Sequence, residues 1–173
     1  MKCTDLLTQE HKVILRALDV LDHMAKRIER EQPVEAQDVE TLLRFLHAFA
    51  DDNHQAKEES ALFPELLRSS CANEPGLRQM IFEHDQERSL VEALEDSLHT
   101  KKGTEFVHFA NRFIGLIRTH IHKEDNILFE IAESALRPEQ DERVTAELQK
   151  FEFDPALMSD LRRLEWAYVR RVA

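Results

Sequence analysis

The sequence predicts an all-α protein, an up-down-up-down four-helix bundle with additional C-terminal helices. Three observations favour this fold class. Only 3 Gly and 5 Pro interrupt 173 residues, 33% of which are charged, and this composition is typical of long helices. Apolar residues recur every three or four positions in four successive segments. The pattern H-x-x-x-E occurs twice, at residues 54–58 and 120–124, and an acid and then Leu-Phe follow each copy.

The first expected helix has an inward face with one polar position. Its apolar positions are Leu7, Ile14, Leu18, Leu21, Ala25 and Ile28. His11 fills the gap in this series between Leu7 and Ile14. We expect the helix to end at residues 31–33 and Pro33 to open the next one, since proline is favoured in a first helical turn.

The second expected helix contains the first copy of the pattern. Its apolar face runs from Leu42 to Leu62, and His54 and Glu58 lie on that face one turn apart. Pro64 removes an amide donor, so we expect the last turns to loosen. The helix should then fade over residues 69–71.

The third and fourth expected helices also have polar residues on their inward faces. A turn at residues 73–76, with Asn73 as a cap and Pro75 in the first turn, opens the third helix. Thr104 is the expected N-cap of the fourth helix. The inward positions are Met80, His84, Glu87, Val91, Leu94 and Leu98 in the third helix, and Phe106, Ala110, Phe113, Ile117, His120, Glu124, Ile127 and Ile131 in the fourth.

The chain beyond the bundle predicts two more amphipathic helices, which begin at Pro138 and Pro155. We expect residues 1–135 to form the bundle and residues 136–173 to form a helical extension packed on it within the same domain. The extension contains Trp166 and Tyr168, the only Trp and Tyr of the chain. A homodimer through these helices, or a lid over the bundle, are the alternative hypotheses.

Antiparallel packing brings the four inward histidines to one level of the bundle. Residues at equal height in an antiparallel pair are equally far from the turn between them. The midpoint of His11 and His54 falls at residues 31–33, and that of His54 and His84 falls near residues 69–73. The midpoint of His84 and His120 falls beside Gly103. The four imidazoles therefore share one level to within about one helical turn, roughly 5 Å.

This level predicts a metal site with six ligands. The ligands are His11, His54, Glu58, His84, His120 and Glu124. Burying these side chains unpaired in an apolar core would cost several kcal/mol for each carboxylate. The free energy of unfolding of a typical domain is only about 5–15 kcal/mol, so we expect a bound cation to offset this cost. Plain core histidines are the alternative. Imidazole and carboxylate without thiolate favour two iron ions bridged by Glu58 and Glu124, with manganese and then zinc as less natural occupants.

Several other residues need an interpretation. Glu87 is either a seventh ligand or an acid that orients a ligand or relays protons. We expect Arg88 to pair with a carboxylate, Glu87 or Glu58, and His47 to lie too far along the axis for the same ions. The histidines off the inward faces, expected to be solvated, are His23, His99, His108 and His122. Glu105 with His108 forms a lone E-x-x-H without a second copy, which argues against a ferritin-type site.

Composition limits the partners. The formal net charge of −11 argues against binding to nucleic acid or to an anionic membrane. No apolar run reaches the length of a membrane span and the N-terminus has no signal-peptide pattern, so we expect a cytoplasmic protein. Cys3 and Cys71 are expected to be free thiols, with a redox-responsive pair as the minor alternative.

The motifs resemble those of the hemerythrin-like, or HHE cation-binding, family. The resemblance covers residues 5–135 and rests on Glu10-His11, His54-x-x-x-Glu58 with Leu62-Phe63-Pro64, Glu83-His84, and His120-x-x-x-Glu124 with Leu128-Phe129. It implies a four-helix bundle with an oxo- or hydroxo-bridged non-haem di-iron centre that meets oxygen, peroxide or nitric oxide. Oxygen-carrying members resemble this pattern but have a fifth histidine where this chain has Arg88, and they use an acid at the position of Asp125.

Three functional hypotheses follow from the resemblance and the residues. The first is a redox protein, not necessarily an enzyme, whose di-iron centre binds or turns over oxygen, peroxide or nitric oxide. The second is an iron-donating or iron-sensing module, similar to the di-iron proteins of iron–sulphur repair, in which the missing fifth histidine makes the site labile. The third is an interaction protein in which the metal is structural.

Overall fold

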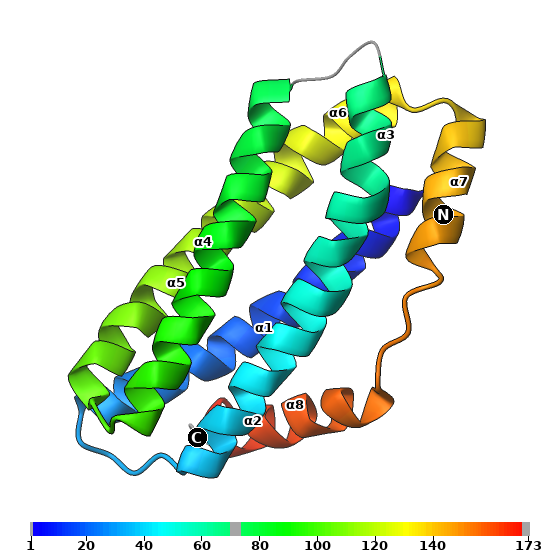
Figure 1. Ribbon diagram of the computed structural model, residues 1–173. Coiled ribbons are helices and arrows are strands. Elements are labelled where there is room, and N and C mark those ends of the chain that lie inside the picture. The colour runs from blue at the N-terminus through cyan, green and yellow to red at the C-terminus, as the bar shows by residue number, and fades with distance from the viewer. Residues whose placement is uncertain (1, 70–73, 171–173) are drawn as a thin grey trace.

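The computed structural model describes residues 2–69 and 74–170 and shows an all-helical chain over these ranges. Four long rods form an up-down-up-down bundle (Figure 1). The elements are α1 (Cys3–Glu29), α2 (Ala36–Leu46), η1 (His47–Gln55), η2 (Glu58–Leu62), α3 (Phe63–Arg68), α4 (Glu74–His99), α5 (Gly103–Lys123), η3 (Glu124–Leu128), α6 (Phe129–Ala135), α7 (Pro138–Leu148) and α8 (Pro155–Tyr168). The expected fold class is therefore confirmed.

Two of the rods contain π-helical turns, here labelled η. The second rod runs from α2 through η1 and η2 to α3, and the fourth runs from α5 through η3 to α6. A π turn closes over five residues instead of four, so it rotates all later residues relative to an unbroken α-helix. The expected inward position of Ile127 is wrong for this reason. Its side chain is 56% exposed, and Leu128 and Ala132 face the core instead.

The predicted helix starts at Pro33 and Thr104 are also wrong. Pro33 lies in the connection between α1 and α2, and α2 begins at Ala36. A proline disfavours helical backbone before it, the backbone of Glu35 is extended, and Val34 packs against the core. At the other turn, the amide of Phe106 already donates to the carbonyl of Lys102, so α5 begins at Gly103. The cap expected at Asn73 lies outside the described residues.

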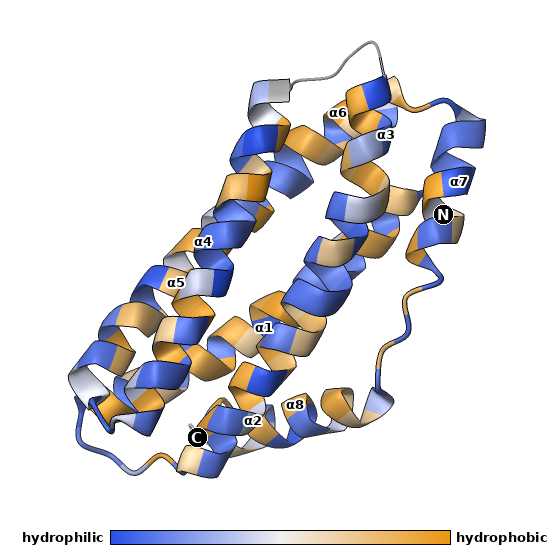
Figure 2. Cartoon of the chain, in the orientation of Figure 1, coloured by the Kyte–Doolittle hydropathy of each residue, from blue (hydrophilic) through white to orange (hydrophobic). Residues whose placement is uncertain are grey.

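The hydrophobic core is divided into two clusters by the polar level. Hydrophobic segments recur along all four rods between hydrophilic ones (Figure 2). One cluster includes Ile14 of α1 and Ile121 of α5, and Leu161 and Leu164 of α8 join it. The other includes Leu7 of α1 and Leu128 of η3, and Val144 and Leu148 of α7 join it. Each C-terminal helix thus packs on one side of the level that holds the histidines.

Three further predictions concern single residues and membrane spans. Cys3 is a free, buried cysteine, and its burial raises the pKa of the thiol. Cys71 lies outside the described residues. Trp166 is 62% exposed, whereas the hydroxyl of Tyr168 donates to Asp38 Oδ2 at 2.7 Å. Within the described residues, no helix has both the length and the apolar character needed to span a bilayer.

Candidate metal centre

The bundle brings the six predicted ligands together in two overlapping groups. One group has His11, His54, Glu58 and Glu124, and the other has Glu58, His84, His120 and Glu124. In each group one ligand atom from every residue lies within 4.8 Å of the others. All six side chains are buried, and both glutamates are fully inaccessible. Each group therefore has the size of a site for one ion.

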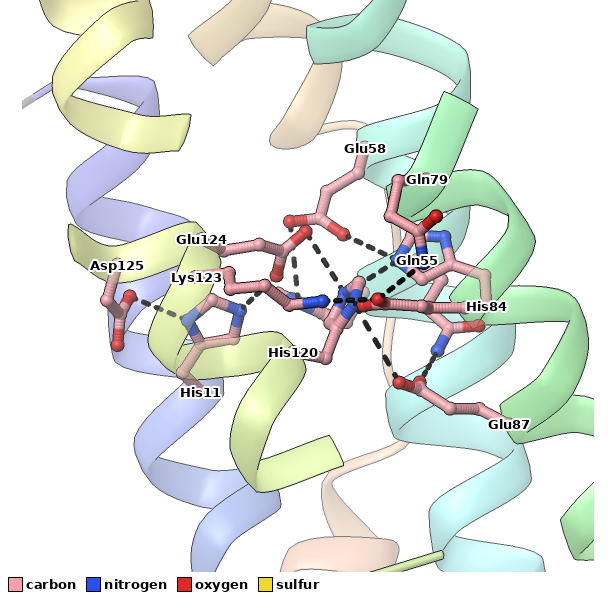
Figure 3. Close-up of polar contacts among 12 residues, drawn as sticks. His11, Gln55, Glu58, Gln79, His84, Glu87, His120, Lys123, Glu124 and Asp125 are labelled. Carbon is pink, nitrogen blue, oxygen red and sulfur yellow. Dashed lines mark hydrogen bonds and ion pairs between the residues drawn. The ribbon is translucent and has the colours of Figure 1, made fainter. Parts of the chain in front are cut away.

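Glu124 lies between the two groups. Its Oε2 is 3.1 Å from Nε2 of His11, and its Oε1 is 3.1 Å from Nε2 of His120 (Figure 3). The i, i+4 spacing of His120 and Glu124 places both side chains on one face of the fourth rod. One carboxylate thus presents one oxygen to each group, which is the arrangement of a bridging ligand.

Glu58 occupies the corresponding position across the bundle. Its Oε1 is 3.6 Å from Nε2 of His54, and its Oε2 is 3.5 Å from Nε2 of His84. His84 and His120, which belong to the same group, have their Nε2 atoms 3.1 Å apart. The two H-x-x-x-E copies therefore contribute equivalent halves, and each half supplies a carboxylate shared by both groups.

The second ring nitrogen of every histidine faces an outer carboxylate. The Nδ1 distances are 2.8 Å from His11 to Asp125, 2.9 Å from His54 to Glu10, 2.7 Å from His84 to Glu59 and 2.8 Å from His120 to Glu83. An Nδ1–H that donates to a carboxylate leaves Nε2 with a free lone pair and fixes the ring. All four imidazoles are thus oriented with Nε2 toward the shared glutamates.

Each outer carboxylate is held by another donor. Lys57 contacts Glu10, Lys123 contacts Glu83, Arg88 Nη2 donates to Glu59 at 2.8 Å, and Thr8 Oγ1 donates to Asp125 at 3.2 Å. These donors come from all four rods, so the orientation of the imidazoles depends on the assembled bundle.

The inner atoms of the site fit a cation. Nε2 of His11 and both oxygens of Glu58 and of Glu124 are buried and have no hydrogen-bond partner. An unsatisfied buried polar group costs about 1–3 kcal/mol, and more when it is charged. Nitrogen and oxygen donors around shared carboxylates suit iron, manganese or zinc. The groups facing these oxygens are imidazole nitrogens, 3.1 Å away at Glu124 and 3.5–3.6 Å away at Glu58, and a cation bound between them would satisfy both sides.

The electrostatics of the metal-free protein are unequal across the site. Burial lowers the pKa of His11 and His120, but their carboxylate neighbours outweigh it and raise both to about 9. Burial raises the pKa of Glu58 well above its usual value, and the nearby Glu124 charge adds to the effect. Burial opposes ionisation of Glu124 too, yet the two histidines hold its pKa well below the usual range. The pKa values of the two shared carboxyls are thus shifted in opposite directions.

Glu87 lies beside the centre but outside both groups. Its side chain is 3% exposed, and Gln55 Nε2 donates to its Oε2 at 2.5 Å. Its Oε1 has no hydrogen-bond partner and lies 3.9 Å from Nδ1 of His120. Burial raises the pKa of this carboxyl to about 7. Glu87 therefore has one carboxyl oxygen free to contact a proton donor or a cation beside His120.

The expected partners of Arg88 are wrong. Its guanidinium contacts Asp51 at 2.6 Å, Glu59 at 2.8 Å and Asp85 at 3.1 Å. Adjacent helical residues point about 100° apart, so Glu87 turns inward and Arg88 turns toward the second rod.

The remaining histidines lie away from the centre. His47 forms a separate group with Asp51 and Asp52. His23 is half-buried, and its Nδ1 lies 2.8 Å from the carbonyl of Asp19. The other three are exposed: His99, His108 and His122. Glu105 accepts from Lys102 and belongs to no metal-sized group among the described residues.

The sequence interpretation missed most of the outer contacts. Lys57 and Lys123 occupy the same position in the two copies, which both read H-x-x-K-E, and this repeat was the signal that could have revealed them. Glu59 and Asp125, the acids that follow the two glutamates, contact imidazoles of other rods, and no such role was expected for them. Gln55 has no counterpart in the second copy, where Ile121 stands, so no repeat pointed to it.

The comparisons with known proteins agree with this geometry. The family model for the hemerythrin HHE cation binding domain matches residues 3–132. No curated protein and no solved structure matches the chain. The matched segment covers most of the 173 residues and contains all six buried ligand candidates. The chain therefore belongs to the hemerythrin HHE cation-binding family.

Proposed function

We propose that the chain holds two iron ions and that this centre binds or reacts with a small molecule, namely oxygen, peroxide or nitric oxide. His11 and His54 would bind one ion, His84 and His120 the other, and the two glutamates both. The observation that carries the proposal is the pair of overlapping groups, each with two imidazoles and two shared carboxylates whose inner oxygens have no partner. Manganese and zinc fit the same donors, but imidazole with bridging carboxylates favours iron.

The protein's own groups determine how such a centre behaves. When bound, two ferrous ions supply electrons and open coordination positions for a small molecule. The outer carboxylates keep each Nε2 directed inward, and the hydrophobic clusters on both sides exclude bulk water. Glu87, buried near His120 with one free oxygen, is the group placed to hold or pass a proton beside the centre.

Anaerobic loading with ferrous iron tests this proposal. The loaded protein is mixed with oxygen, peroxide or nitric oxide, and near-ultraviolet charge-transfer absorption is followed together with consumption of the added molecule. Binding of two ions and a spectral change with at least one of the three molecules are expected. Two tightly bound ions that react with none of them would contradict the proposal and leave a structural role for the metal.

Ligand variants with a matched control test the site itself. His54→Ala and Glu124→Ala should each prevent the binding of two ions, because each removes an inner donor. His122→Ala is the control, since this histidine lies two residues after His120 and is exposed. Retention of both ions in either ligand variant would refute the assignment.

A second candidate function is iron donation or sensing. The observation that favours it is Arg88. At this position the oxygen-carrying members that this chain resembles have a fifth histidine. Its guanidinium is engaged by Asp51, Glu59 and Asp85, so it offers no donor to the centre. Transfer of iron to a chelator or an apo-acceptor within minutes, without reaction with the three small molecules, would favour this candidate over the first.

A further inference from the structure

A surface cavity of about 240 Å³ lies between the second rod and α4. His47, Asp51 and Glu95 are among the residues at its outer part, where side chains are exposed or half-buried. Gln55 and Glu87 line its inner part and are buried. The cavity therefore leads from solvent toward the side chains next to the metal centre.

A second, much smaller space continues inward from this cavity. It measures about 10 Å³, close to the lower limit for one water molecule, and His54 and His120 line it. Gln55 and Glu87 line both spaces, and the hydrogen bond between them lies beside the histidines (Figure 3). Ala50 and Ile117 line both spaces as well, so the hydrogen-bonded pair is the polar part of what separates the outer cavity from two of the four imidazoles of the centre.

The separating pair has two unused oxygen atoms. Oε1 of Glu87 and Oε1 of Gln55 are buried without a hydrogen-bond partner, in side chains that are 3% and 4% exposed. Leaving such atoms unpaired is costly, so each calls for an explanation. A carboxylate oxygen and an amide carbonyl oxygen are acceptors only, and both are ligands for hard divalent cations. The two oxygens offer no hydrogen-bond donor and no positive charge to an anionic ligand.

The outer part of the cavity has the same electrostatic character. His47 and Asp51 line the cavity, and together with Asp52, which lies just outside its lining, they form a group whose ligand atoms lie within 4.8 Å of one another. Glu92 and Glu95 also line the cavity. Arg88 is the opposing charge in the lining, and it pairs with Asp51 at 2.6 Å as well as with Glu59 and Asp85, which lie outside the cavity. Glu87, Glu92 and Glu95 are the lining carboxylates that take part in none of these ion pairs, so the carboxylates remain in excess. A cleft with an excess of carboxylates concentrates cations and repels anions.

We propose that this cavity is the path by which divalent cations reach the centre, with His47, Asp51 and Asp52 as the outer binding group and with Glu87 and Gln55 as the inner relay. A cation held by Oε1 of Glu87 and Oε1 of Gln55 replaces the hydrogen bond from Gln55 Nε2 to Glu87 Oε2 and gains access to His54 and His120. The charges favour this occupant over a neutral gas, which gains nothing from carboxylates. The inference rests on the proposed function only in requiring that the centre bind metal.

The rate of metal uptake by the metal-free, full-length protein tests the path. Cobalt(II) is the probe, because it does not need a small-molecule reactant and its visible absorption reports coordination. Glu87→Gln keeps the shape of the side chain and removes its charge. We expect uptake by this variant to be about tenfold slower than in the wild type, in the range by which a charged cleft raises association rates. The final stoichiometry should remain two.

Release to a chelator distinguishes a path from a ligand. A residue that only lowers the barrier along the path changes uptake and release by the same factor, so the affinity stays constant. Parallel slowing in Glu87→Gln therefore supports the proposal. A lower stoichiometry, or faster release with unchanged uptake, would make Glu87 a ligand and overturn it. Unchanged rates in both directions would overturn it as well.

The outer group and a control complete the experiment. The double variant His47→Ala, Asp52→Asn should slow uptake and weaken its dependence on ionic strength, since exposed charges are screened by salt. Glu130→Gln removes an exposed carboxylate from α6 and should leave the rate unchanged. Equal slowing in this control would show a net-charge effect and refute the path. None of these readings involves oxygen, peroxide or nitric oxide, so the path and the proposed reactivity can fail separately.

Discussion

Replacing Glu58 by methionine should stabilise the metal-free protein and destabilise the metal-loaded one. Both oxygens of Glu58 are buried without a hydrogen-bond partner. Burial lowers the pKa of the neighbouring His54 to about 4, so that imidazole is neutral and offers no charge to compensate. Methionine has a similar length and flexibility and no polar group to desolvate. In the metal-free state the buried carboxyl of Glu58 therefore destabilises the fold, because no interaction offsets its desolvation.

The magnitude follows from the two unpaired oxygens. Removing an unsatisfied buried polar group should raise the free energy of unfolding by about 1–3 kcal/mol. For a chain of this size that corresponds to roughly 2–12 °C in melting temperature. Each of the two ions, at 100 times its dissociation constant, stabilises the wild type by about 2.7 kcal/mol. Glu58 is shared by both groups, so the variant should lose most of both contributions, which exceeds the gain of about 1–3 kcal/mol without metal. The order of stability should thus reverse between the two states.

Thermal unfolding with a chelator and with excess cobalt(II) measures both states. Glu65→Met is the matched control, because Glu65 is also buried but accepts hydrogen bonds from Arg68, Gln140 and Arg143. This control should be destabilised in both conditions by about 1–2 kcal/mol. If Glu58→Met unfolds below the wild type in the presence of chelator, the carboxyl has stabilising partners in the metal-free state and the reasoning is refuted.

Three further predictions concern protons, outer contacts and the C-terminal helix. The pKa of His11 and His120 is about 9, and metal needs neutral imidazoles, so binding at pH 7 should release at least two protons. The raised pKa of Glu58 can only add to this number, so the logarithm of the apparent affinity should rise by at least about two per pH unit as the pH approaches 9. Calorimetry in buffers of different ionisation enthalpy measures this, and no buffer dependence would contradict it. Asp125→Asn removes the charge that fixes the imidazole of His11 and should lower metal affinity about 10–100-fold, as measured by chelator competition. An unchanged affinity would show that Asp125 does not have this role. Tyr168→Phe removes the hydrogen bond to Asp38 and should lower the free energy of unfolding by about 1–2 kcal/mol without changing the metal stoichiometry. An unchanged melting temperature would show that this hydrogen bond does not stabilise the fold.

The arrangement of the rods could be predicted because it depends on local periodicity. Apolar residues at helical spacing specify which face is buried, and short connections require antiparallel neighbours. These two rules were enough to bring His11, His54, His84 and His120 to one level, and the structure has them in two adjacent pairs with ring centroids 4.6 and 4.8 Å apart. That these residues bind metal stays a prediction.

The outer contacts could not be predicted in the same way because they cross between rods. The sequence shows an acid after each of the two shared glutamates, but it does not show which imidazole that acid reaches. Glu59 of the second rod contacts His84 of α4, and Asp125 of the fourth rod contacts His11 of α1. Such pairings depend on the rotation of each rod to within a few tens of degrees. The partners of Arg88 were mistaken for the same reason.

The π turns explain why both copies of the pattern end in Leu-Phe. In η2 the amide of Phe63 donates to the carbonyl of Glu58, five residues back, and in η3 the amide of Phe129 donates to that of Glu124. The phenyl ring of Phe63 then stacks on His84 at 5.9 Å between centroids, and that of Phe129 stacks on His11 at 5.5 Å.

An unbroken α-helix would keep the third and fourth residues after each glutamate on its face, and the fifth would point away. With the wider turn, the fourth residue stays buried and the fifth covers an imidazole of the neighbouring rod. Leu62 and Leu128 fill the cluster on one side of the polar level, and the two phenyl rings wall the centre itself. The exposure of Ile127 is a consequence of this local change of register. The Leu-Phe pair is therefore as much a part of the metal site as the histidine and the glutamate that precede it.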